Sequence, residues 1–151
     1  MSLKLQFASL SFGASVDQQT GNLSVFDVIE DIKTPQVPIQ LQSIVIALCL
    51  EKSAEDIFNG KMMIHFLAPD GSQRVVGQGE MNVPIEQRRM KAVFRFGAFP
   101  ITAFGSHRFV LSWLDASNKK IGEALLDFSV TQVTQVAQAL DQNQPKPSMQ
   151  H

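Results

Sequence analysis

Four acidic residues near the start of the chain are the first candidates for chemistry. Asp17 lies in a polar stretch, and Asp27, Glu30 and Asp31 lie in the apolar stretch that follows it. Carboxylates that lie close together can exchange protons with a substrate or hold a cation. The sequence therefore raises the question of an acidic site in this region.

The spacing of these acids favours a structural role. Asp27 and Asp31 alternate with apolar residues in a period of two, which is typical of the partly wet face of an edge strand. These apolar residues are Leu23, Val25 and Ile29. Because charges on an edge strand block pairing by another chain, we favour a hairpin with a protected edge over a catalytic or metal site.

Histidine and thiol chemistry is also poorly supported. His65, His107 and His151 are far apart in the sequence and lack the close spacing with cysteine or acidic ligands that a metal site needs. Ser106 and His107 put a hydroxyl beside a base, but neighbouring strand residues point to opposite faces. Cys49 lies in an apolar run, where a thiol is a poor nucleophile. We expect no enzyme activity, no cofactor and no metal.

Composition and charge narrow the range of partners. The chain has 13 basic and 14 acidic residues and a formal net charge of −1, so no long-range field attracts nucleic acid or anionic lipid. Cys49 is the single cysteine, which indicates a reducing compartment. No apolar stretch approaches the roughly 20 residues of a membrane span. We expect a cytoplasmic protein that binds neither membrane nor nucleic acid.

Apolar runs recur roughly every 10 to 20 residues and are separated by polar turns, which indicates an antiparallel all-β domain. The expected fold is an immunoglobulin-like β-sandwich of about 7 to 8 strands over residues 1–130, followed by a short C-terminal helix. The expected strands are residues 4–14, 22–32, 40–52, 61–68, 73–83, 89–97, 107–114 and 121–130.

The run from Ile44 to Leu50 is apolar on both faces, so a second layer must cover it. A candidate cover is residues 131–142, whose apolar residues have the spacing of one helical stripe. These are Val133, Val136, Ala137 and Leu140. We expect this helix to pack on a sheet of its own chain or of a second subunit, and a frayed tail is the alternative. Residues 143–151 are expected to be disordered.

If each strand crosses the sandwich once, alternate connections share an end of the domain. The turns at 17–22, 53–60, 84–88 and 115–120 then form a charged rim. The other end collects the apolar loops, including Phe99, Ile101 and Phe104. These three residues either plug the core, which we favour, or form an exposed patch that binds a partner.

Four stretches together resemble a family of small bacterial proteins known only as a domain of unknown function. They are FASLSFGASVDQQTGNLSVFDVIEDI, PIQLQSIVIALCLE, APDGS and FGSHRFVLSWLD. The resemblance covers roughly residues 5–130 and rests on turn signatures. It implies an immunoglobulin-like sandwich, and it supplies neither an activity nor catalytic residues. The segment 131–142 lies outside it.

Two functions stay open. We prefer a non-catalytic interaction module that forms a homodimer or binds another protein, using the doubly apolar sheet and the stripe of Val133, Val136, Ala137 and Leu140. The alternative is a sandwich that binds a small ligand or a carbohydrate at the apolar loop end.

Overall fold

The computed structural model describes residues 3–53 and 55–134, and all the regular structure in these two ranges is β-strand. Nine strands are formed: β1 (Leu3–Val16), β2 (Leu23–Val28), β3 (Asp31–Thr34), β4 (Ile39–Lys52), β5 (Phe58–Leu67), β6 (Gln73–Val83), β7 (Arg89–Ile101), β8 (Gly105–Asp115) and β9 (Lys120–Gln132). The expected all-β class is confirmed, with nine strands in place of the 7 to 8 expected.

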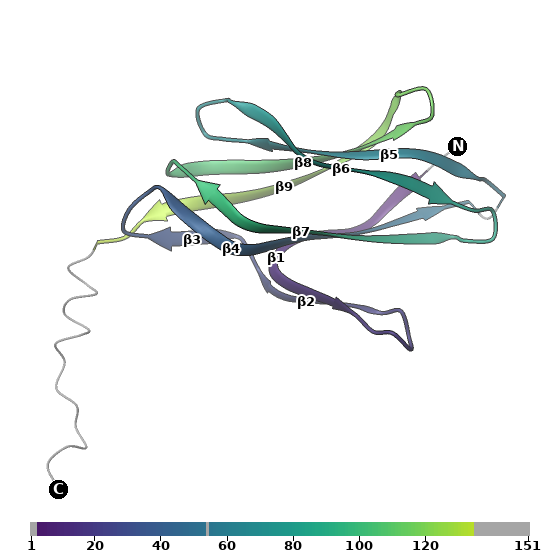
Figure 1. Cartoon of the computed structure of the whole chain (residues 1–151), viewed down its shortest axis with the longest axis horizontal. Coiled ribbons are helices and arrows are strands. Elements are labelled where there is room, and N and C mark those ends of the chain that lie inside the picture. Colours follow the sequence, from purple (N-terminus) through teal and green to yellow (C-terminus); the bar gives the residue numbers. More distant parts are fainter. Residues whose placement is uncertain (1–2, 54, 135–151) are drawn as a thin grey trace, which may run out of the picture.

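The strands form two sheets that face each other (Figure 1). One sheet has four strands in the order β2-β1-β4-β7, and the other has five in the order β3-β9-β8-β5-β6. Neighbouring strands are antiparallel except β3 and β9, which run parallel. From β4 onward, β5–β6 and β8–β9 are hairpins and the other three connections cross from one sheet to the other, so a single core lies between the two layers.

The single strand expected over residues 22–32 is wrong, because the structure divides it into β2 and β3. Asp27 has a φ of 56°, which an extended strand does not tolerate. Ile29 is buried and its N–H donates to the carbonyl of Leu10 at 2.8 Å. The chain therefore leaves the four-stranded sheet after Val28 and joins the five-stranded sheet at Asp31.

The expected start of the C-terminal helix at residue 131 is also wrong. Strand β9 continues to Gln132, with Thr131 paired to Lys33 and Gln132 paired to Thr34. The N–H of Val133 then donates to the Thr34 carbonyl at 3.1 Å. The remaining residues of the expected helical stripe lie outside the described residues. They are Val136, Ala137 and Leu140.

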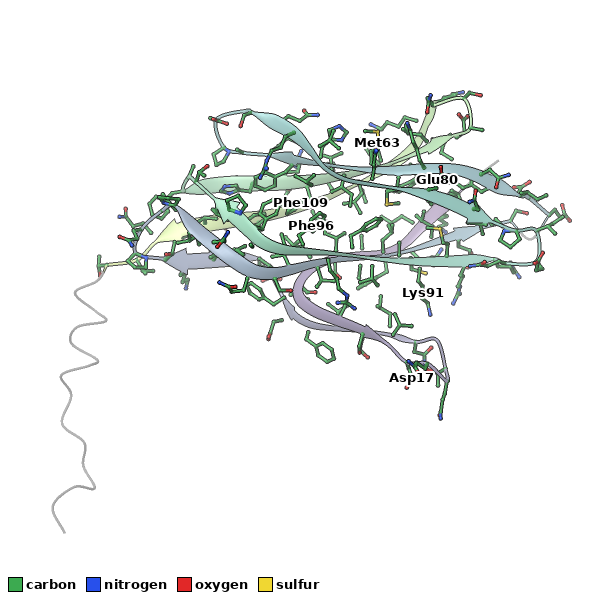
Figure 2. The ribbon with its side chains drawn as sticks, viewed as in Figure 1. Asp17, Met63, Glu80, Lys91, Phe96 and Phe109 are labelled. Atoms are coloured by element: carbon green, nitrogen blue, oxygen red, sulfur yellow. The ribbon has the colours of Figure 1, made fainter. Side chains whose placement is uncertain are left out.

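Aromatic rings fill the middle of the core. Phe96 of β7 and Phe109 of β8 come from opposite sheets and meet between them, with ring centroids 6.3 Å apart (Figure 2). Phe99 and Phe66 extend the cluster from the same two layers, with centroids 5.0 Å apart and the rings nearly perpendicular. Edge-to-face and offset aromatic pairs add about 0.5–1.5 kcal/mol each beyond simple burial. This cluster joins the two sheets.

Both faces of β4 are buried, as its sequence indicates, and among the described residues the cover of its outer face is the β1–β2 hairpin. Val45 and Ala47 face away from the core and are 1% and 0% exposed. The β1–β2 hairpin lies beneath this face of the sheet (Figure 1). Two cations on the outer face of β7 connect to it, since Lys91 donates to the Gly21 carbonyl and Arg95 donates to the Ala14 carbonyl. The hairpin thus covers part of its own sheet.

Trp113 of β8 is 2% exposed and lies opposite Gly122 of β9. A Cβ atom at position 122 would be only 2.4 Å from the indole ring. The glycine is therefore required by the close approach of the indole, and Trp113 belongs to the core.

His107 lies at the edge of the aromatic cluster and is almost fully buried. Its ring stacks on Phe128 with centroids 5.0 Å apart, and Nδ1 lies 3.0 Å from the Gly105 carbonyl. A carbonyl can only accept, so Nδ1 carries the proton and donates it. Burial lowers the pKa of His107, because the charged form loses hydration, and the hydrogen bond to Gly105 opposes this in part.

We predict that Gly122→Ala lowers the free energy of unfolding by about 1–3 kcal/mol, because the new methyl group displaces the indole ring. Urea unfolding followed by Trp113 fluorescence measures the change. Gly97→Ala is the matched control, since the nearest atom to its new Cβ is 3.8 Å away. Equal stabilities of the two variants would contradict the packing described for Trp113.

We also predict that burial of His107 makes folding sensitive to mild acid. The folded-state pKa lies below the unfolded value of about 6.5, so the unfolded chain takes up the proton first as the pH falls. The contribution of His107 to stability is present above pH ~6.5 and is lost below it, with a slope of at most about 1.4 kcal/mol per pH unit. Urea unfolding between neutral pH and the carboxylate range measures this slope. His107→Asn should flatten it, and an unchanged slope would show that another group is responsible.

Candidate functional site

The acids that opened the sequence analysis do not converge on one site. Asp17 accepts hydrogen bonds from the backbone N–H groups of Thr20 and Gln19 at 2.8 Å, and these bonds lower its pKa. Asp31 accepts from the hydroxyl groups of Ser129 and Thr131 at 3.1 and 2.7 Å. One acid therefore shapes a turn and the other joins β3 to β9. Within residues 3–53 and 55–134, no group of three or more histidine, cysteine or acidic residues could hold a metal ion.

The histidine and thiol residues are equally separate. His107 is buried in the aromatic cluster, whereas the neighbouring Ser106 is exposed. Cys49 is half-buried on the outward face of β4, opposite Phe7 of β1. His65 lies half-buried on β5. The described residues therefore place none of these groups beside a partner that would make it a nucleophile or a base.

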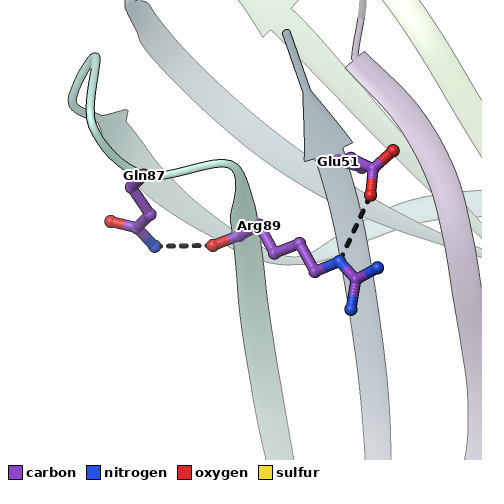
Figure 3. Close-up of polar contacts among 3 residues, drawn as sticks. All are labelled: Glu51, Gln87 and Arg89. Carbon is purple, nitrogen blue, oxygen red and sulfur yellow. Dashed lines mark hydrogen bonds and ion pairs between the residues drawn. The ribbon is translucent and has the colours of Figure 1, made fainter. Parts of the chain in front are cut away.

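The loops collect at two ends, as expected from the alternation of strand directions. The four connections that begin near residues 17, 53, 84 and 115 lie at one end, on the right in Figure 1. At this end one acidic residue of β4 pairs with one basic residue of β7. The Nε of Arg89 donates to Glu51 at 3.2 Å, while Gln87 donates to the Arg89 carbonyl at 2.8 Å (Figure 3).

The opposite end carries the three phenylalanine and isoleucine residues of the predicted patch. Phe99 is 5% exposed and Ile101 is 0% exposed, so both belong to the core. Phe104 is half-buried and packs against that core. The favoured reading, in which these residues plug the core, agrees with this placement. Phe99 and Ile101 therefore form no exposed patch.

Arg74 covers these core residues, and the sequence pattern does not predict this position for it. Its guanidinium carbon lies 5.6 Å from the ring centroid of Phe66 and 5.3 Å from that of Phe99. A bulge in the pairing of β5 with β6 places Arg74 opposite Phe66, on the core side of the sheet. Simple alternation along β6 could not reveal this, because the bulge changes the phase of the strand.

Two open cavities meet at Arg74. One, of about 460 Å³, lies beside the β5–β6 turn and the end of β7. The other, of about 440 Å³, lies between β6 and β7. Arg95 lines the second cavity, and no acidic residue lines either one. None of the ion pairs found in the described parts of the chain includes Arg74 or Arg95. This end therefore carries unneutralised positive charge above an apolar floor.

A second surface stands out on the β1–β2 hairpin and the start of β1. Among residues 3–53 and 55–134, six of the ten exposed large hydrophobic residues lie on these two strands. They are Leu5, Phe7, Phe12, Val16, Phe26 and Val28. We call these six residues the hairpin surface. The alternation of polar and apolar residues in this segment predicts only a hairpin with a protected polar edge. The phenylalanine content of the segment is the signal that could have located the surface.

The described residues contain no helix long and apolar enough to cross a membrane.

Solved structures share the architecture at very low sequence identity. A crustacean hemolymph-type prophenoloxidase matches 99% of this chain with 36% of its own, at 8% identity and a TM-score of 0.53. A β-glucosidase from Listeria innocua matches 85% of this chain with 17% of its own, at 6% identity and a TM-score of 0.46. The chain thus spans about a third or less of these proteins, and the likeness to the prophenoloxidase concerns the fold alone.

The curated proteins include no match to this sequence. A family model does match, over residues 6–121, which is most of the chain and includes the strands from β1 to β8. The expected resemblance to a domain of unknown function is confirmed by this match, and the chain belongs to the family of unknown function DUF6941.

Proposed function

We propose that this chain is a non-catalytic interaction module that self-associates through the hairpin surface. The observation that carries the proposal is the concentration of exposed large apolar side chains on β1 and β2. Exposed apolar side chains that gather on one part of a fold mark interaction sites more often than single residues scattered over the surface do. The proposed contact lies on the hairpin, whereas the sequence pattern predicts it on the helical stripe of residues 131–142.

The hairpin exposes apolar side chains on both of its faces. By the register of β1 and β2, Phe26 and Val28 share one face and Phe12 and Val16 share the other. Their exposed fractions run from 44% to 58%. A hairpin that only covered its own sheet would need apolar residues on one face, so the second face supports a partner.

Strand β2 is also an edge of the four-stranded sheet, with a free row of backbone groups. The positive φ of Asp27 interrupts that row near its end, which limits regular pairing to Leu23–Phe26. This agrees with the protective role that the sequence suggests for Asp27. Side-chain packing of the hairpin surface therefore supports association better than a long strand-to-strand contact does.

The occupant we propose is a second copy of the chain. The formal net charge of −1 gives two copies little mutual repulsion. In an isologous contact both copies use the same surface, so each contact between two residues occurs twice and the apolar area buried per residue is doubled.

Strand order supports the finer proposal of an immunoglobulin-like sandwich. Strands β4 and β7 pair in one sheet, and β5, β8 and β9 pair in the other, as strands B and E and strands C, F and G do in that fold. Strand β3 then corresponds to the part of the first strand that crosses over to run parallel with the last. Within this frame the β1–β2 hairpin is an addition, and additions to a common scaffold are where function is placed.

We predict that the full chain is a dimer and that Phe26→Ser with Val28→Ser raises its dissociation constant by at least about tenfold, because truncating central interface residues costs over 1 kcal/mol each. Light scattering after gel filtration over a wide concentration range measures the mass. Urea unfolding confirms that the variant stays folded, as expected for exposed positions.

The matched control is Val75→Ser with Leu125→Ser, which removes equally exposed side chains from the five-stranded sheet. This control should dimerise like the parent. If the parent chain is a monomer at every concentration, the proposal of self-association is wrong. If the control substitutions weaken the dimer as much as Phe26→Ser with Val28→Ser does, the assignment of the contact to the hairpin surface is wrong.

A further inference from the structure

The strongest unexplained feature outside the hairpin surface is Arg74. Its guanidinium is exposed, is held over two buried phenylalanine rings and is at the junction of two cavities. Elsewhere in the described residues, Arg89 and Arg108 have acidic partners, Glu51 and Asp127. Within the same residues Arg74 has no acidic partner, although two aromatic rings lie within cation–π distance of its guanidinium.

A cation–π contact holds the guanidinium by its charge and does not use its N–H groups as hydrogen-bond donors. The N–H groups at the edge of the planar fork can therefore still bind a carboxylate with two parallel hydrogen bonds. The rings of Phe66 and Phe99 hold the group over the core. Less side-chain freedom is then lost on binding, which is an advantage of a preorganised site.

The surroundings fit an anion with an apolar body. Pro100 lines both cavities, Phe66 lines the first and Phe96 lines the second. Ser72 and Thr102 supply hydroxyl groups in the first cavity. A phosphate prefers a denser set of donors, and Arg95 already donates one N–H to the Ala14 carbonyl at 3.1 Å. A single carboxylate on an aromatic or aliphatic body matches these walls better.

We propose that Arg74 is the anion-binding group of a site for a carboxylate carried on an apolar body, seated where the ends of β6 and β7 meet the β5–β6 turn. The carboxylate binds the free edge of the guanidinium, and the apolar body lies against Pro100 and the neighbouring rings. This site is separate from the hairpin surface and does not depend on dimer formation.

The test is a titration of the full chain labelled with ¹⁵N, followed by NMR. The probe is sodium 4-phenylbutyrate, and the neutral 4-phenylbutyramide has the same body without the charge. The carboxylate should shift the signals of Arg74 and of residues near Pro100, whereas the amide should bind at least about tenfold more weakly, as expected for loss of a charge-assisted pair.

A second arm identifies the source of the carboxylate. Acetyl-Ala-Ala-Phe with a free C-terminus is compared with the same peptide amidated. If the acid peptide binds at Arg74 and phenylbutyrate does not, the carboxylate belongs to a protein terminus and the proposed chemistry stands. If neither acid binds, or if acids and amides bind equally, the proposal is wrong.

Two variants localise the effect. Arg74→Gln removes the charge and Arg74→Lys keeps the charge without the planar fork, so both should weaken binding, the first by at least about tenfold. Arg88→Gln, at the opposite end of the domain, should bind like the parent. Urea unfolding with Trp113 fluorescence verifies that each variant is folded. Unchanged binding by folded Arg74→Gln would overturn the proposal whatever the oligomeric state.

Discussion

Burial of both faces of β4 is the constraint on which the rest of the structure depends. On one face Ile44, Ile46 and Leu48 enter the core, and on the other Val45 and Ala47 are equally inaccessible to water. Each large aliphatic side chain buried in this way contributes about 1.5–3 kcal/mol relative to exposure. A strand with two dry faces needs a layer on each side. The five-stranded sheet supplies one layer, and the β1–β2 hairpin supplies the other.

This arrangement explains why β1 pairs with different strands along its length. Its first part, up to Ser11, pairs with β4 within the sheet, and from Ser11 to Val16 it pairs only with β2. Lys91 and Arg95 then hold the hairpin to the outer face of β7 (Figure 2). The segment that shields the sheet is thereby also the segment that brings apolar side chains to the surface. The β1–β2 hairpin therefore both covers the outer face of its own sheet and carries the residues of the proposed interaction.

Much of this fold is predictable from the sequence, because strand periodicity and turn residues are local signals. The expected strand at 40–52 lies within one residue of β4, and the loops divide between the two ends as their alternation requires. The failures come from non-local effects. Asp27 and Asp31 look like one alternating strand, yet the positive φ of Asp27 and the burial of Ile29 send them to different sheets.

The same limit applies to the two candidate surfaces. Arg74 reaches the core side of β6 only because a bulge shifts the register, and a single sequence carries no marker for that bulge. The covering of Val45 by the hairpin depends on how β1 bends, which its alternation does not encode. Phe99 and Ile101, by contrast, lie in the core as favoured for the apolar loop end, but the sequence does not reveal that β7 continues through them, because the positive φ of Ala98 shifts their phase relative to Phe94 and Phe96.

The parallel pairing of β3 with β9 has a consequence for how the domain assembles. Hydrogen bonds there join Asp31 to Ser129 and Thr131, which are 98 and 100 residues later in the chain. Contacts between such distant residues are entropically costly to form early, and they slow folding in proteins where they dominate. Because β9 is the strand beside β3 in the five-stranded sheet, β3 cannot join that sheet during synthesis until β9 has left the ribosome. Pairing of β3 with β9 is therefore a late step of folding, and the five-stranded sheet is complete only after β9 has been synthesised.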